Sequence, residues 1–175
     1  RKIDRQRLQE FMKMLGREVD ERGRVYFTGG ATALLFGWRD ATIDIDLQIV
    51  PESDKFFRAL PGLKEKLQVN IELASPSHFI PELPGWVERS PFFAQEHSLS
   101  FYHYDLYAQA LSKVERSHQR DREDVRQMIR RGLISPSQLS ELFEKIFPLL
   151  YKYPAIDPAA FRRNLESVLS ESPEQ

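Results

Sequence analysis

This sequence of 175 residues contains no cysteine, which excludes disulfide bonds and thiolate metal sites. It also lacks any apolar run near the roughly 20 residues that a membrane-spanning helix needs, so we expect no membrane association. No signal-peptide-like segment is visible at its start, and we find no internal repeat or low-complexity linker. Together these absences favour a cytoplasmic globular protein.

The residues that are present support a folded core with an uneven distribution of charge. Hydrophobic residues make up 41% of the chain and charged residues 29%. Residues 1–24 hold eight basic and five acidic side chains. Residues 40–106 hold five basic and eleven acidic side chains, and residues 113–131 hold seven basic and four acidic ones. An acidic middle between basic flanks suits a metal–nucleotide site rimmed by phosphate-binding groups, although ordinary charged helical surfaces would give the same pattern.

The most informative stretch runs from residue 25 to residue 47. A β-prone segment at 25–27 leads into Gly29-Gly30, a turn signal, and an apolar helix is predicted over 31–38. Residues 43–47 then alternate aliphatic and acidic side chains. Because side chains alternate along a strand, Asp44 and Asp46 should share one face and the aliphatic residues the other.

This arrangement is costly without a ligand and useful with one. Two carboxylates one pleat apart repel each other, and a divalent cation with oxygen ligands would relieve the repulsion. A glycine turn before a helix presents backbone N–H groups at the positive end of the helix dipole, where a phosphate binds well. Phosphate at the turn and metal at the acids is the layout needed to move a nucleotidyl group.

The same residues carry a resemblance to a known superfamily. The resembling string consists of Gly29-Gly30, a short helix, Arg39, Thr42 and the Asp44-x-Asp46 pair. It resembles the signature of the polymerase-β-like nucleotidyltransferases, and within them a minimal bacterial group that includes AbiEii-type toxins and the DUF6036 type. The resemblance runs from about Val25 to Leu133. It implies an NTP substrate such as ATP, Mg²⁺ or Mn²⁺ as cofactor, an acceptor such as tRNA or protein, and a setting in which a toxin has a cognate antitoxin.

The resemblance also assigns roles to the acids. Asp44 and Asp46 are expected to be catalytic and to hold the metals. A strand predicted over residues 69–73 puts Glu72 on the face opposite its aliphatic residues, and Glu72 matches the superfamily's third carboxylate. An exposed acid on an ordinary strand would look the same.

Four further residues are expected to bind the nucleotide. Gly29 and Gly30 would hold the β- and γ-phosphates, Arg39 would contact phosphate, and Thr42 belongs to the same signature. Because Gly30 lies at the expected start of a helix, we predict that alanine is tolerated there.

A second group of charged residues lies further along the chain. The stretch from Lys113 to Asp124 resembles a K-x-x-R…(K/R)-D-x-x-D pattern of AbiEii-like proteins. Lys113 and Arg116 share a helix face, as do Asp121 and Asp124 on the next helix. In one interpretation Lys113 and Arg116 bind the nucleotide, with Lys113 on the triphosphate, and the two aspartates orient them. In the other, these residues form ordinary salt bridges that tie two helices together.

The predicted fold is α+β, with a small mixed sheet of the nucleotidyltransferase type, packed helices and a C-terminal helical bundle. We expect a core lobe over residues 1–104 and a helical lobe over 105–175. A helix over 52–60 should break at Pro61-Gly62, and residues 76–91 should be irregular loop. Strands near 92–94 and 99–103 should form a hairpin. The histidines, at positions 78, 97, 103 and 118, lack metal-ligand spacing and are expected to be structural or exposed.

Two functions therefore remain open from the sequence. The first is metal-dependent transfer of a nucleoside monophosphate from an NTP to an acceptor. The alternative is a non-catalytic protein of the same fold that binds a nucleotide, a nucleic acid or a partner protein. Metal-dependent NTP consumption that is lost when Asp44 is neutralised would distinguish them.

Overall fold

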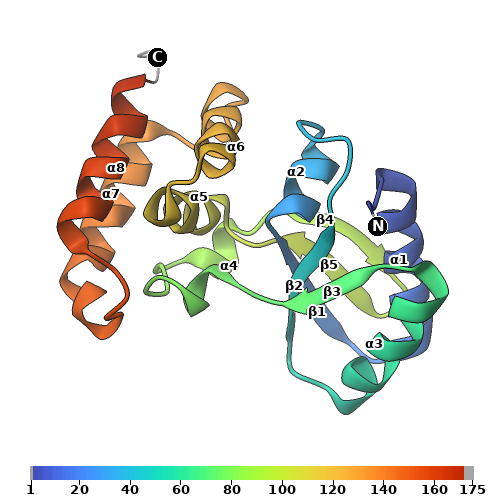
Figure 1. Cartoon of the computed structure of the whole chain (residues 1–175). Coiled ribbons are helices and arrows are strands. Elements are labelled where there is room, and N and C mark those ends of the chain that lie inside the picture. Colours follow the sequence, from blue (N-terminus) through green and yellow to red (C-terminus); the bar gives the residue numbers. More distant parts are fainter. Residues whose placement is uncertain (1, 172–175) are drawn as a thin grey trace. The chain divides into compact units, whose positions relative to one another are not determined.

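A computed structural model describes residues 2–171 and divides the chain into two compact units. The first unit holds the chain up to Ser75 together with Ser90–Tyr104. The second holds Pro76–Arg89 and the chain from Asp105 onward. Figure 1 shows the strands gathered in the first unit and a group of helices forming the second.

The first unit is built on a five-stranded mixed sheet in the order β3-β2-β1-β5-β4. β1 pairs with β2 in antiparallel fashion and with β5 in parallel, β2 pairs in parallel with β3, and β4 and β5 form an antiparallel hairpin. The strands are β1 (Gly23–Thr28), β2 (Asp44–Val50), β3 (Asn70–Leu73), β4 (Phe92–Glu96) and β5 (Leu99–His103).

Three helices of this unit bury one face of the sheet. They are α1 (Arg5–Val19), α2 (Gly30–Phe36) and α3 (Asp54–Leu67). Apolar side chains recur along α1 at helical spacing, and they pack against alternate residues of β1, β2 and β5 such as Phe27, Leu47 and Phe101. The charged residues of β2 consequently lie on the opposite face of the sheet.

The second unit is helical apart from its connecting loops. Its elements are η1 (Pro76–His78), α4 (Trp86–Arg89), α5 (Leu106–Arg116), α6 (Gln119–Arg130), α7 (Pro136–Ile146), η2 (Phe147–Lys152) and α8 (Pro158–Glu171). Asp105 caps α5 by accepting from the Tyr107 backbone N–H at 3.2 Å, and its carboxylate also pairs with Arg89 at 2.7 Å. Ser135 caps α7 in the same way, with a proline at the first helical position.

The α+β prediction, with a mixed sheet followed by a helical bundle, is confirmed. Two local predictions are wrong. α3 continues through Pro61 and Gly62 because Phe56, Leu60 and Leu63 are buried on both sides of the proline, while Pro61 itself is exposed. Residues 76–91, expected to be irregular, contain η1 and the short helix α4.

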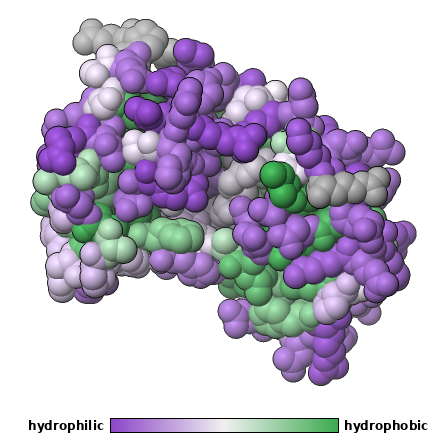
Figure 2. Space-filling model, in the orientation of Figure 1, coloured by the Kyte–Doolittle hydropathy of each residue, from purple (hydrophilic) through white to green (hydrophobic). Residues whose placement is uncertain are grey.

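The face of the molecule drawn in Figure 2 is mainly polar. Figure 2 shows hydrophilic residues over most of the visible face, with apolar residues in scattered patches. Within residues 2–171, every helix is too short or too polar to cross a membrane.

Candidate metal centre

The sheet brings together the three carboxylates that the sequence singled out. In the parallel pairing of β2 with β3, Asp44 lies opposite Asn70 and Asp46 lies opposite Glu72. One carboxylate oxygen from each of Asp44, Asp46 and Glu72 can be chosen so that all three lie within 4.8 Å of one another. Asp44 and Asp46 are half-buried and Glu72 is exposed, so the group is reachable from solvent.

Strand periodicity explains why these acids share a face. Along β2 the aliphatic residues Ile45, Leu47 and Ile49 are buried, and the residues between them are partly exposed. Two aliphatic residues expected on the buried face are not buried. Ile43 precedes β2 and is 58% exposed, and Leu73, the last residue of β3, is 48% exposed.

Sequence reasoning missed the role of Asn70. The Asn70 side-chain amide donates a hydrogen bond to Asp44 Oδ1 at 2.6 Å and another to Glu72 Oε1 at 3.4 Å. An amide N–H between two carboxylates offsets part of their mutual repulsion and fixes their orientation. The signal was present, since strand alternation placed Asn70 on the same face as Glu72. Asn70 therefore relieves part of the repulsion that the sequence analysis left to a metal alone.

The glycine turn lies directly beside these acids. Gly29 has φ = +61°, a backbone conformation that other L-residues adopt only with strain. A Cβ on Gly29 would lie 3.0 Å from Asp46 Oδ2. Gly29 is therefore required both by its backbone conformation and by the close approach of the Asp46 carboxylate.

Gly30 is required for a different reason, and the prediction that alanine is tolerated there is wrong. A Cβ on Gly30 would lie 2.0 Å from Thr42 Oγ1 and 2.8 Å from Thr42 Cβ. Thr42 is held in place because its backbone exchanges hydrogen bonds with Ile3, and its hydroxyl donates to the Asp44 carbonyl at 3.1 Å. Thr42 thus packs α2 against the start of the acidic strand. Arg39 lies half-buried in the same loop, between α2 and β2.

The second group of charged residues also assembles, between α5 and α6. Lys113 Nζ lies 2.9 Å from Asp124 Oδ2 and 3.8 Å from Asp121 Oδ1. Arg116 reaches Asp121 Oδ1 at 2.7 Å. The side chains of Lys113, Asp121 and Asp124 are at most 8% exposed, whereas that of Arg116 is 44% exposed. These contacts fit both the orienting role and the salt-bridge role that the sequence left open.

His103 lies apart from the acids, on the helix-covered face of β5. Its Nδ1 lies 3.0 Å from the Thr32 hydroxyl, and its ring packs against that of Phe36, with the centroids 4.6 Å apart and the ring planes tilted by 38°. Burial lowers the pKa of His103 to about 4, so the ring is neutral at pH 7. The other histidines, at positions 78, 97 and 118, are exposed.

The donor set at the sheet fits a hard divalent cation. Three carboxylates supply the oxygen ligands that Mg²⁺ and Mn²⁺ prefer, and the exposure of Glu72 keeps the cluster in contact with solvent. The glycine turn lies next to these carboxylates, with Gly29 packed against Asp46 and Gly30 against Thr42.

The small mixed sheet, which carries a carboxylate cluster beside a glycine turn, is consistent with a protein of the nucleotidyltransferase class. The chain belongs to the family described as nucleotidyltransferase of unknown function (DUF6036), whose model matches residues 6–159. No curated protein and no solved structure matches the chain.

Proposed function

We propose that this protein transfers a nucleoside monophosphate from an NTP to an acceptor in a reaction that depends on Mg²⁺ or Mn²⁺. The observation that carries the proposal is the convergence of Asp44, Asp46 and Glu72 within 4.8 Å on one sheet face. The family description supports the same reaction class.

In this reaction an acceptor oxygen forms a bond to the α-phosphorus of the NTP. The bond from that phosphorus to the oxygen bridging the α- and β-phosphates breaks, pyrophosphate leaves with the electron pair, and the acceptor proton passes to solvent. A bound divalent cation would polarise the phosphate oxygens and stabilise the charge that develops on them. Asp44, Asp46 and Glu72 would hold that cation, and Asn70 would keep two of the carboxylates oriented.

The remaining residues would position the triphosphate. The backbone N–H groups of the Gly29-Gly30 turn would hold its β- and γ-phosphates, and Arg39 would add a positive charge. Thr42 would act by packing the turn against the acidic strand.

In the helical unit, Lys113 and Arg116 would contact phosphate and their aspartate partners would orient them. That assignment, like tRNA or protein as acceptor and the pairing with an antitoxin, rests on the resemblance alone.

The test is to incubate the protein with each α-labelled NTP, Mg²⁺ and total cell RNA or protein. We expect label on an acceptor with the wild type and none with Asp44→Asn. Asp40→Asn, which neutralises an exposed acid in the loop before β2, is the matched control and should keep full activity. If the wild type labels nothing with any NTP, or if Asp44→Asn keeps wild-type activity, the proposal is wrong and the non-catalytic alternative stands.

A further inference from the structure

The sheet face that carries the acids extends well beyond them as three ordered rows of side chains. Because paired residues on neighbouring strands point to the same face, the strand register defines each row. The first row is acidic and includes Asp46, paired with Glu72 on β3 and with Thr28 on β1. The second row, two residues along, joins Gln48, Tyr26, Tyr102 and Phe92. The third row joins Val50, Arg24, Ser100 and Gln95.

The second row is aromatic over three adjacent strands. Tyr26 and Tyr102 stack with ring centroids 5.3 Å apart, and Phe92 meets Tyr102 edge-on at 5.6 Å. Phe92 is 58% exposed although it is a large apolar residue, and Tyr102 is partly exposed. Exposed aromatic rings on a sheet face are the structure on which nucleic-acid bases stack.

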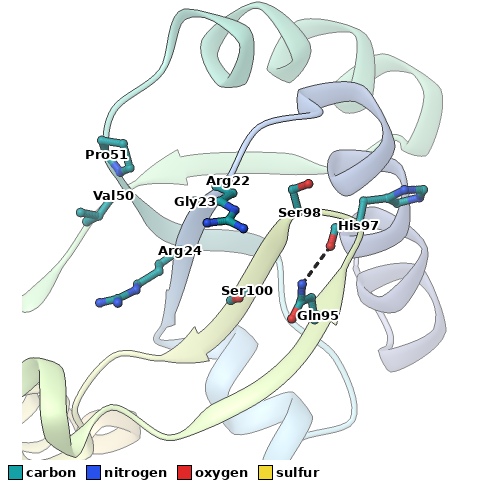
Figure 3. Close-up of a pocket in the computed structure, with 9 residues that line it drawn as sticks. All are labelled: Arg22, Gly23, Arg24, Val50, Pro51, Gln95, His97, Ser98 and Ser100. Carbon is teal, nitrogen blue, oxygen red and sulfur yellow. Dashed lines mark hydrogen bonds between the residues drawn. The ribbon is translucent and has the colours of Figure 1, made fainter.

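The third row forms one wall of a basic groove. The groove has a volume of about 520 Å³ and is lined by Arg22, Gly23, Arg24, Val50, Pro51, Gln95, His97, Ser98 and Ser100. Figure 3 shows these residues coming from the start of β1, the end of β2 and the β4–β5 hairpin. None of the nine lining residues, all within the described part of the chain, is acidic. Arg24 hydrogen-bonds to Tyr26, which raises the pKa of Arg24 and places its guanidinium beside the aromatic row.

The rows are spaced so that one linear ligand can contact all of them. Asp46 and Val50 are four residues apart on β2, so the acidic row and the basic row are separated by about 13 Å along the strand. A polyanion with flat bases could lie across this distance with its phosphates on the arginines and a base on the aromatic rings.

We propose that this face binds a single-stranded nucleic acid as the acceptor, with bases stacked on Phe92 and Tyr102, phosphates held by Arg22 and Arg24, and the reacting end directed to the acids. This inference rests on the proposed nucleotidyl transfer. Charge complementarity favours nucleic acid over a protein acceptor, since the groove offers cations and neutral donors but no carboxylate for basic side chains.

The test is fluorescence anisotropy with a labelled single-stranded RNA 12-mer, measured without NTP or divalent metal. Phe92→Ala should weaken binding by about five-fold to 150-fold, the range for loss of one base–aromatic stack. Arg24→Gln should make the plot of log affinity against log salt shallower by about 0.7, the value for one phosphate contact on a single strand. The matched controls lie on α3, where Phe57→Ala and Arg58→Gln alter exposed side chains and should leave both quantities unchanged.

Loss of RNA affinity in the two test variants but not in the controls supports the inference. If both test variants bind the RNA as tightly as the wild type does, the inference is wrong. It is also wrong if the wild-type protein does not bind the RNA but transfers label to a protein acceptor. Because this binding assay contains no NTP and no metal, failure of the transfer reaction leaves its result unchanged. The two proposals can therefore fail separately.

Discussion

His103 should make the stability of this protein depend on pH in a range where few other groups titrate. The ring is buried on the core face of β5, and burial lowers its pKa from 6.5 to about 4. As the pH falls below 6.5 the unfolded chain therefore binds a proton that the folded protein does not. Stability from this group is complete above pH 6.5 and is lost progressively between pH 6.5 and pH 4.

The size of the effect follows from the two pKa values. At pH 5 the unfolded histidine is almost fully protonated and the folded one is mostly neutral, which lowers the free energy of unfolding by about 2 kcal/mol relative to pH 7.5. At pH 4 the loss would approach about 3 kcal/mol, but carboxylates also titrate there. The range from pH 7.5 to pH 5 therefore isolates the histidine.

The assay is urea unfolding at several pH values in that range, with the wild type and His103→Leu. We expect the wild type to lose about 2 kcal/mol between pH 7.5 and pH 5 and the variant to be nearly flat, whatever its absolute stability. His118→Leu removes an exposed histidine and should follow the wild-type curve. A variant His103→Leu with the same pH dependence as the wild type would refute the burial argument.

Two further predictions concern packing. Gly30→Ala should cost about 1–3 kcal/mol of stability, because the added Cβ meets the Thr42 side chain. The control is Gly62→Ala, which should cost nothing because no atom lies within 4 Å of the added Cβ. Equal melting temperatures of Gly30→Ala and wild type would contradict this prediction. Lys113→Ala should lower the free energy of unfolding, measured in urea, by roughly 3 kcal/mol. The reason is that it removes the ammonium group that pairs with the buried Asp124 carboxylate. A cost below about 1 kcal/mol would show that the pair contributes little, and unchanged Mg–NTP affinity of the folded variant in calorimetry would leave Lys113 only the helix-tying role.

Local patterns were enough to predict most of the elements and the shared face of the acids, but not the continuation of α3 or the short helices η1 and α4. The alternation around Asp44 and Asp46 is a property of a single strand, so no knowledge of the sheet was needed to place both carboxylates on one side. The position of Glu72 could not be predicted from one strand, because its closeness to Asp46 depends on the parallel register of β2 with β3. The sequence indicated that closeness only through the resemblance.

The features that the sequence could not supply all depend on contacts between distant segments. The clash that forbids a Cβ at Gly30 comes from Thr42, which is itself fixed by pairing with Ile3. The break expected at Pro61 does not occur because burial of Phe56 and Leu63 outweighs the lost hydrogen bond. Propensity alone could not weigh that burial, because it depends on the sheet against which α3 packs.

Direct binding of a divalent cation tests the central claim without any knowledge of the acceptor. Electron paramagnetic resonance follows the six-line signal of free aqueous Mn²⁺ as protein is added. We expect the wild type and Asp40→Asn to remove that signal by binding the ion. Asp46→Asn takes one carboxylate from the cluster and should leave most of the free Mn²⁺ signal in place. Equal Mn²⁺ binding by wild type and Asp46→Asn, or no binding by the wild type, would contradict the assignment of Asp44, Asp46 and Glu72 as a metal centre.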